Sequence, residues 1–257
     1  IVEKLSKKRM MSGMHALWSV GCFAGAGLFS ILAKLGLGIS QIAIIHCIII
    51  FMIIFAFSRY FLPYKGASNG KAIAIPKGIV TLFGVLAVIS FLGEGGMMDW
   101  SGVFLTEAKG VDLSLAGVGY AVFSAAMLIG RLIGDKVVQK LGEQRVVIFG
   151  GIVASIGYII SIVFDNFFMM QFGFILLGFG AANIVPVVFT LLGRQKEMPI
   201  NSAVTAVTSM GYLGVMFGPA LLGFIAHGIG IVTVFCILAG LFILQAIVSS
   251  YVFKVLN

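Results

Sequence analysis

Eight long apolar segments, separated by short polar breaks, account for most of this chain. Their bounds are 10–33, 39–62, 79–105, 112–133, 145–164, 167–193, 201–226 and 229–253. A helix needs about 20 apolar residues to cross a hydrocarbon core of ~30 Å. Because backbone polar groups in lipid must be hydrogen-bonded within the segment, each one is predicted to be a helix. The pattern therefore predicts an all-α integral membrane protein with eight transmembrane helices.

Positive charge gathers on alternate breaks between these segments. Of the 17 lysines and arginines, all except Lys34 and Lys109 lie on the side that holds both chain ends and the breaks 63–78, 134–144 and 194–200. Basic loops stay in the cytoplasm, so this side is predicted to be cytoplasmic in a multi-pass membrane protein. The formal charge of +8 follows from this bias. With 60% hydrophobic and only 10% charged residues, no nucleic-acid partner is expected.

The longest polar break, 63–78, is rich in Pro, Gly, Ser and Lys, which is typical of a linker between bundles. Two segments precede it and six follow. Since transporters are often built from repeated bundles, we expect residues 1–62 to end an N-terminal bundle and residues 79–257 to form a six-helix C-terminal bundle. Four helices would then be missing upstream, and a first residue of Ile agrees with a fragment. The alternative is an ordinary cytoplasmic loop.

The most specific motif lies within residues 130–145. Gly130 and Gly134 are four residues apart, so they share a helix face and let another helix come close. Gly142 permits a tight turn into the next segment. Asp135 lies at the predicted cytoplasmic edge, where a carboxylate can face the positive N-terminal end of another helix. Countercharge for it is expected from Arg131, Lys136 and Arg145.

This motif resembles the signature loop of the major facilitator superfamily, which that family carries between helices two and three and, often more weakly, between helices eight and nine. The order of segments matches the second copy. Residues 211–219 resemble a Gly-Pro-rich eleventh helix, and residues 93–101 resemble the seventh helix of a bacterial branch similar to the fucose–proton symporters. The resemblance implies family helices five to twelve. The chief departure is the absence of helices one to four.

A cytoplasmic latch is the expected role of this motif. It would close against the start of segment 10–33, near Ser6–Ser12, when the protein faces outward, because a carboxylate there meets a helix N-terminus and nearby lysines. The latch residues are Gly130, Arg131, Gly134, Asp135, Gly142 and Arg145.

Glu94 is the candidate for proton coupling, because ionisable groups within a bilayer are costly and tend to be functional. Counting ~1.5 Å per residue from Ile79 puts it about 22 Å along its segment. Gly95 and Gly96 follow, so the helix can break or bend there. The alternative is a structural carboxylate bonded to a neighbouring helix or reaching the outer interface.

Further polar residues within the segments are candidates for a substrate path. For His15 the alternative is a structural hydrogen bond to another helix, and for those of segment 201–226 it is bonding to other helices. In segment 201–226 several of them recur on one helix face, and Asn183 precedes an expected kink at Pro186. The candidates are His15, Trp18, Asp99, Asn183, Thr205, Ser209 and Tyr212.

The leading functional prediction is a secondary active transporter of a small solute. The resemblance implies rocker-switch alternating access and, through the branch, a sugar-like substrate; protons are the expected coupling ion. One alternative is a drug or metabolite exporter of the same superfamily. Another is a non-transporting membrane sensor or assembly subunit, if the eight-helix chain is complete.

An enzyme is disfavoured. The sequence contains no metal-ligand cluster, no nucleophile–base pair with a known spacing and no phosphate-binding glycine loop. No cofactor or metal is expected. The expected partners are the lipid bilayer, the solute, protons and the missing N-terminal helices.

Overall fold

The computed structural model describes residues 10–61 and 74–256, and helices account for nearly all of them. Their order along the chain is α2 (Met11–Lys34), α3 (Ile39–Phe57), η1 (Ser58–Tyr60), α4 (Ile79–Val103), η2 (Phe104–Ala108), η3 (Leu113–Leu115), α5 (Val118–Leu141), α6 (Glu143–Val163), α7 (Phe167–Ala181), α8 (Ile184–Leu192), α9 (Ile200–Ile229) and α10 (Ile231–Leu256). Helices α7 and α8 together occupy one predicted segment. Each of the eight predicted segments is therefore helical.

Within the described residues, six of these segments are long and apolar enough to cross a membrane: those of α3, α4, α6, α7 with α8, α9 and α10. Helices α2 and α5 are not among them, and α5 carries Arg131, Asp135, Lys136 and Lys140. The protein is an all-helical membrane protein. Most of the predicted linker 63–78 lies outside the described residues. Only its residues 74–78 are described.

The chain forms two compact units. The smaller contains the described residues from Leu17 to Phe61, and the larger contains Met10–Ala16 and residues 74–256. In the smaller unit, Gly36 turns the chain at φ +84°, a left-handed value that suits glycine. His46 then joins the two helices there, because its Nε2 lies 3.2 Å from the carbonyl oxygen of Gly25.

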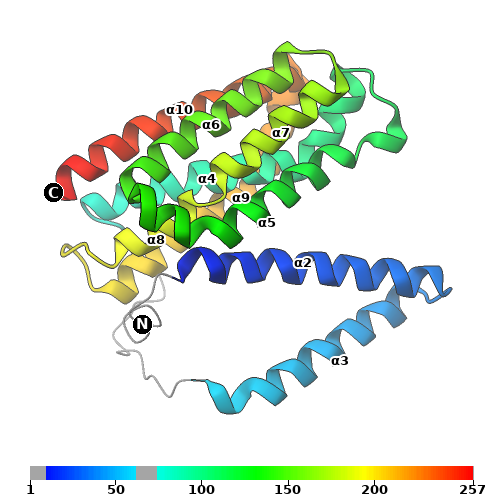
Figure 1. Ribbon diagram of the computed structural model, residues 1–257, viewed down its shortest axis with the longest axis horizontal. Coiled ribbons are helices and arrows are strands. Elements are labelled where there is room, and N and C mark those ends of the chain that lie inside the picture. The colour runs from blue at the N-terminus through cyan, green and yellow to red at the C-terminus, as the bar shows by residue number, and fades with distance from the viewer. Residues whose placement is uncertain (1–9, 62–73, 257) are drawn as a thin grey trace. The chain divides into compact units, whose positions relative to one another are not determined.

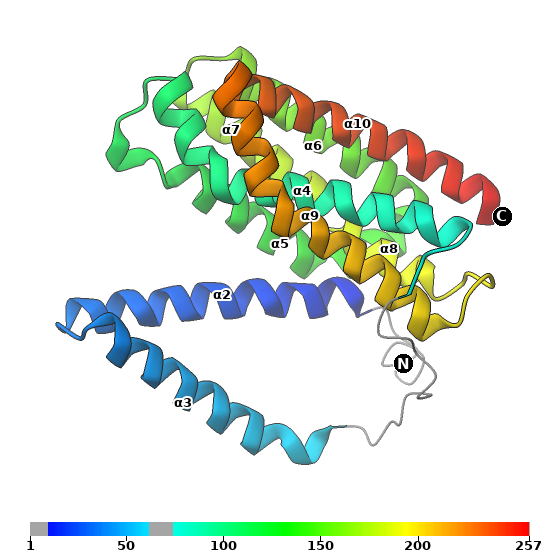
Figure 2. The same ribbon diagram turned by 180° about the vertical axis from the view of Figure 1, so that it is seen from behind.

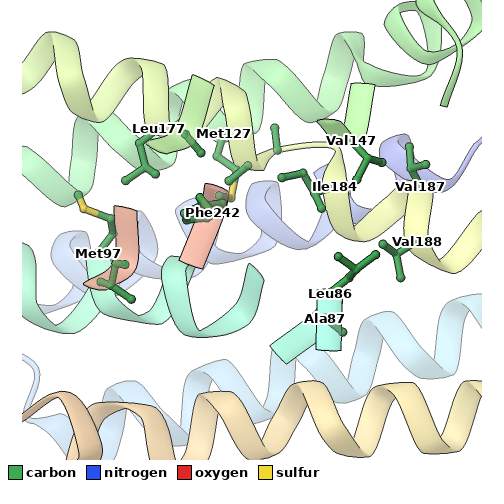
Figure 3. Close-up of a cluster of buried hydrophobic side chains, with 14 of the residues drawn as sticks. Leu86, Ala87, Met97, Met127, Val147, Leu177, Ile184, Val187, Val188 and Phe242 are labelled. Atoms are coloured by element: carbon green, nitrogen blue, oxygen red, sulfur yellow. The ribbon is translucent and has the colours of Figure 1, made fainter. Parts of the chain in front are cut away.

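The larger unit is a helical bundle. Helices α10, α6, α7 and α5 lie side by side across it (Figure 1), and α9 lies beside α4 in the view from behind (Figure 2). Its core is aliphatic and aromatic. Figure 3 shows Met127 of α5, Leu177 of α7 and Phe242 of α10 near one another in the interior, and Leu86 of α4 near Val188 of α8 in another part of the same core. These buried contacts position the polar residues described below.

Glycines allow the closest approach between helices of this bundle. A Cβ on Gly157 of α6 would lie 2.5 Å from the carbonyl oxygen of Gly173 on α7, and a Cβ on Gly173 would lie 2.6 Å from that of Gly157. Such distances leave no room for a side chain. Small residues at helix interfaces are the usual means of tight packing in membranes, where lipid competes for apolar contacts.

The predicted bounds of one segment were wrong. Segment 112–133 is helix α5, which begins at Val118 and continues to Leu141. The predicted loop 134–144 is consequently helical, apart from Gly142 at φ +84°. Apolarity marks where a helix leaves the membrane core, whereas the helix itself continues on amphipathic residues until glycine ends it.

Gly95 and Gly96, where the sequence allows a break or a bend, do not break the helix, because α4 runs without interruption from Ile79 to Val103. Gly96 packs against Leu238 of α10, where a Cβ would lie 2.6 Å from Leu238 Cδ1. The glycine therefore serves a helix contact rather than a break. The chain leaves α-helical geometry later, in the π-helical turn Phe104–Ala108.

Candidate functional site: a buried ion pair and a capped helix start

Glu94 of α4 and Arg131 of α5 form an ion pair inside the larger unit. Arg131 Nη2 donates to Glu94 Oε2 at 3.1 Å, and the two side chains are 8% (Arg131) and 19% (Glu94) exposed. Among the described residues, Glu94 Oε1 is buried and has no hydrogen-bond partner. A buried carboxylate is tolerated when a cation compensates its charge. Glu94 is thus bonded to a neighbouring helix. This is the contact expected if Glu94 is a structural carboxylate, the alternative to a proton-coupling group.

The interruption between α7 and α8 supplies a second partner for Arg131. Pro186 has no backbone N–H, so the carbonyl of Ala182, four residues earlier, has no helical donor. Arg131 Nε donates to this oxygen at 3.3 Å. The predicted kink near Pro186 is therefore present, and it frees a carbonyl that orients the arginine.

Asn183 lies at the same interruption and is buried. Its Nδ2 donates to the carbonyl oxygen of Gly130 at 3.0 Å, which ties the interruption to α5. Gly134 lies close to this side chain, since a Cβ there would overlap Asn183 Oδ1 and lie 2.9 Å from Ser12 Cβ. The two glycines of the motif therefore do let other segments approach α5.

Asp135 caps the first turn of α2. Its Oδ1 accepts a hydrogen bond from the backbone N–H of Ser12 at 3.1 Å, and its Oδ2 accepts one from Gly13 at 3.0 Å. The first N–H groups of a helix have no partner within it, and a carboxylate there satisfies them and meets the positive end of the helix dipole. This is the contact that the latch hypothesis requires. Ser6–Arg9, the earlier part of the predicted contact, lie outside the described residues.

A further ion pair joins the start of α6 to the residue that follows α8 and its C-cap. Gly142 makes the turn into α6, and Glu143, the first residue of α6, accepts a hydrogen bond from Arg194 at 2.7 Å. Arg145, expected to supply countercharge to Asp135, is exposed on α6. The turn at Gly142 thus brings α6 back toward the end of α8.

In the described part of the chain, the other candidates form no hydrogen bond with the ion pair. His15 Nδ1 lies 2.9 Å from the carbonyl oxygen of Met11 in its own helix, and its ring lies 6.3 Å from that of Phe189. Trp18 belongs to the smaller unit and is 72% exposed. Asp99 is exposed on α4.

Three candidates share the polar face of α9. Thr205 donates to the carbonyl oxygen of Asn201 in its own helix at 2.9 Å. Ser209 is exposed, and Tyr212 is exposed with its ring 6.1 Å from that of Phe91. These hydroxyls therefore face outward from the bundle, unlike the buried side chain of Asn183.

Sequence reasoning did not pair Arg131 with Glu94; it expected Arg131 to be part of the countercharge around Asp135. With α5 ending at Leu141, Arg131 lies ~15 Å from the end of its helix, and Glu94 lies ~22 Å from the start of the antiparallel α4. A long arginine side chain spans the difference between these two depths. Two opposite charges at similar depth on neighbouring helices were therefore the sequence signal that could have predicted the ion pair.

This arrangement offers electrostatic rather than covalent chemistry. Within residues 10–61 and 74–256, no group of three metal-ligating side chains lies together. The available groups are a carboxylate with one unbonded oxygen, a guanidinium that holds it, and a helix start held by a second carboxylate one turn further along α5. Such groups suit proton binding and a change of helix contacts.

The fold and these buried charges define a multi-pass helical membrane protein. Residues 83–256 match the family model described as Major Facilitator Superfamily, and the chain belongs to this superfamily of membrane transporters, which are not enzymes. An uncharacterized MFS-type transporter of Yersinia pestis is 44% identical over 230 residues, covering 88% of this chain and 59% of the relative. An uncharacterized transporter of Sinorhizobium fredii is 29% identical over 232 residues, covering 88% and 61%.

A solved structure supports the fold. The crystal structure of a peptide transporter POT (E310Q mutant) in complex with sulfate matches with a TM-score of 0.59 at 20% identity, covering 74% of this chain and 39% of that one. At this identity the match concerns the fold alone. The chain spans about three fifths of the length of the curated relatives named above.

Proposed function

We propose that the complete protein containing this chain is a secondary active transporter of a small, sugar-like solute, coupled to protons. Two helical bundles would rock about a central site to expose it alternately to each side. Residues 79–257 would form the C-terminal bundle and 63–78 the linker, with the basic breaks in the cytoplasm of a bacterium. Membership of the superfamily supports transport, and resemblance of residues 93–101 to the fucose–proton symporter-like branch is the reason for a sugar.

The contact of Asp135 with Ser12 and Gly13 is the observation that carries the mechanism. The carboxylate binds two backbone N–H groups of a helix that the family resemblance assigns to the other bundle. Charge at a helix N-terminus contributes about 1 kcal/mol, up to about 2 when partly buried. Since the contact forms only when the cytoplasmic ends of the bundles meet, it would favour the outward-facing state.

A labelling experiment tests this latch. The complete protein receives a reporter Met216→Cys on the exposed face of α9, in a background without its natural cysteines, and is labelled from outside with an impermeant maleimide. Asp135→Asn should slow labelling about fivefold, because about 1 kcal/mol in favour of the outward-facing state is lost. Glu107→Gln, an exposed carboxylate far from Asp135 in sequence, is the matched control and should not change the rate. Equal rates for Asp135→Asn and the parent would contradict the latch.

Glu94 is the proposed proton site. Its Oε2 is held by Arg131 while Oε1 lacks a partner among the described residues, so a proton added there would weaken the ion pair without moving the backbone. Cells with the parent protein should alkalinise an unbuffered medium when one member of a monosaccharide panel is added. Glu94→Gln should abolish this signal and retain counterflow of the same sugar. Unchanged alkalinisation in Glu94→Gln would remove the coupling role.

The alkalinisation experiment, together with an assay of dye accumulation, separates the alternatives. An exporter would give no alkalinisation with any sugar but would lower the accumulation of an apolar dye in cells. A sensor or assembly subunit would give neither result. Both alternatives remain compatible with superfamily membership, because the chain covers only part of its relatives.

A further inference from the structure

A groove of about 610 Å³ opens at the end of the larger unit where α5 turns into α6 and where α8 and α10 end. It is distinct from the ion pair of Glu94 and from the capped start of α2. Its lining comes from the last turn of α5, the first turn of α6, Leu191 and Arg194 around the end of α8, and Phe253 and Leu256 of α10. The groove is therefore built from four helices of one bundle.

The lining of the groove is positively charged. Lys140, Arg145 and Arg194 contribute three cations, against one carboxylate from Glu143. That carboxylate is only 7% exposed and is bonded to Arg194, whose side chain is still 54% exposed. Lys140 and Arg145 are exposed. The start of α6 after Gly142 adds the positive end of a helix dipole. The groove consequently favours an anion.

Apolar side chains lie beside these cations. Leu191 and Phe253 are almost fully buried and form part of the lining, and the exposed Leu141 stands at the end of α5. A small soluble anion makes no use of such groups. A molecule with a phosphate next to hydrocarbon uses both, and basic pockets between helix ends on the cytoplasmic side are suited to anionic headgroups.

We propose that this groove binds an anionic phospholipid, with its phosphate among Lys140, Arg145 and Arg194 and the adjoining acyl chain against Leu141 and the partly exposed Leu256. The end of the bundle that carries the groove is the one predicted to be cytoplasmic, so the lipid comes from the inner leaflet. This binding is independent of solute transport. It would anchor the turn at Gly142, about two turns beyond Asp135.

Native mass spectrometry of the complete protein tests the proposal. The protein is purified in detergent micelles and titrated with dioleoylphosphatidylglycerol, and the affinity for the first bound lipid is measured. Lys140→Gln and Arg145→Gln should each weaken it about fivefold, and the double variant about 25-fold, as expected for basic side chains at an anionic surface. Lys254→Gln removes an exposed lysine of α10 outside the groove lining and should leave the affinity unchanged.

Three results would overturn the proposal. Dioleoylphosphatidylcholine binding as tightly as dioleoylphosphatidylglycerol would show that the charge is not recognised. An equal loss in Lys254→Gln and in the double variant would show a general surface effect. Displacement of the lipid by an equal concentration of glycerol 3-phosphate would make the groove a site for soluble phosphates. If the double variant does not fold, the single variants and the lipid comparison in the parent protein still decide.

Discussion

Two sets of polar residues in the larger unit look alike in sequence and differ in the structure. Glu94, Arg131 and Asn183 are bonded to one another's helices in the interior, and Ser90 likewise meets Gln245 of α10 at 3.0 Å. The polar face of α9 is different, since Ser209 and Tyr212 are exposed and Thr205 bonds within its own helix. The interior set bonds between helices of the bundle and leaves one oxygen each of Glu94, Asn183 and Gln245 without a partner among the described residues, whereas the α9 face is open.

The difference separates residues that hold the bundle together from residues available to something else. A polar side chain in a membrane must bond to another helix or face a cavity. The residues of the interior set bond to other helices, so their first role is structural. Any role in coupling must act through changes in these existing bonds. Among the described residues, the hydroxyls of Thr205, Ser209 and Tyr212 on α9 form no hydrogen bond with another helix of the bundle. The α9 face is therefore the better candidate for contact with a solute or with helices outside this chain.

Removing the cation of the interior set should have the largest effect. Arg131→Met leaves the carboxylate of Glu94 buried without compensation and the carbonyl of Ala182 without a donor. Such a change costs about 3–5 kcal/mol. The free energy of unfolding of the complete protein, measured by reversible unfolding in mixed micelles, should fall by this amount.

The double variant Glu94→Gln with Arg131→Met is the matched control for that measurement. It removes both charges, so most of the lost stability should return. If Arg131→Met alone were as stable as the parent, the ion pair would not be a structural element of the bundle, and the division between the two polar sets would fail.

The comparison also shows how far sequence reasoning reached. The eight helices followed from apolarity and length, and the kink followed from Pro186, because both depend on local chemistry. The contact between Asp135 and the start of α2 matched the general preference of a carboxylate for a helix N-terminus.

What sequence reasoning missed depends on contacts between helices. The pairing of Glu94 with Arg131 was not foreseen, because apolarity does not show that α5 continues to Leu141 and so does not show how deep Arg131 lies. Spacing shows which residues of α9 share a face, not what that face meets. The packing of Gly96 against Leu238 likewise depends on a contact between helices.

Glycines should show a similar contrast, with a smaller effect. Gly157→Ala places a methyl group 2.5 Å from the backbone oxygen of Gly173, so α6 and α7 must separate. Overpacking of this kind costs about 1–3 kcal/mol. Gly240→Ala on α10 meets nothing within 4 Å and should be neutral or slightly stabilising, because alanine favours helix more than glycine does. Thermal unfolding of both variants in the same detergent is the measurement, and equal melting temperatures would contradict the packing argument.

The smallest expected effect gives the sharpest test of the two polar sets, because the same chemical change is made in each. Ser90→Ala removes the hydroxyl that accepts from Gln245 Nε2, so a buried amide loses its partner at a cost of about 1–3 kcal/mol. Ser209→Ala on the open face should change stability by less than about 0.5 kcal/mol. Sugar counterflow should show the opposite order once corrected for the amount of folded protein: Ser209→Ala should reduce the rate, and Ser90→Ala should not. If Ser209→Ala destabilises the complete protein as much as Ser90→Ala does, then the α9 face is bonded to helices outside this chain. Its hydroxyls would then belong to the structural set.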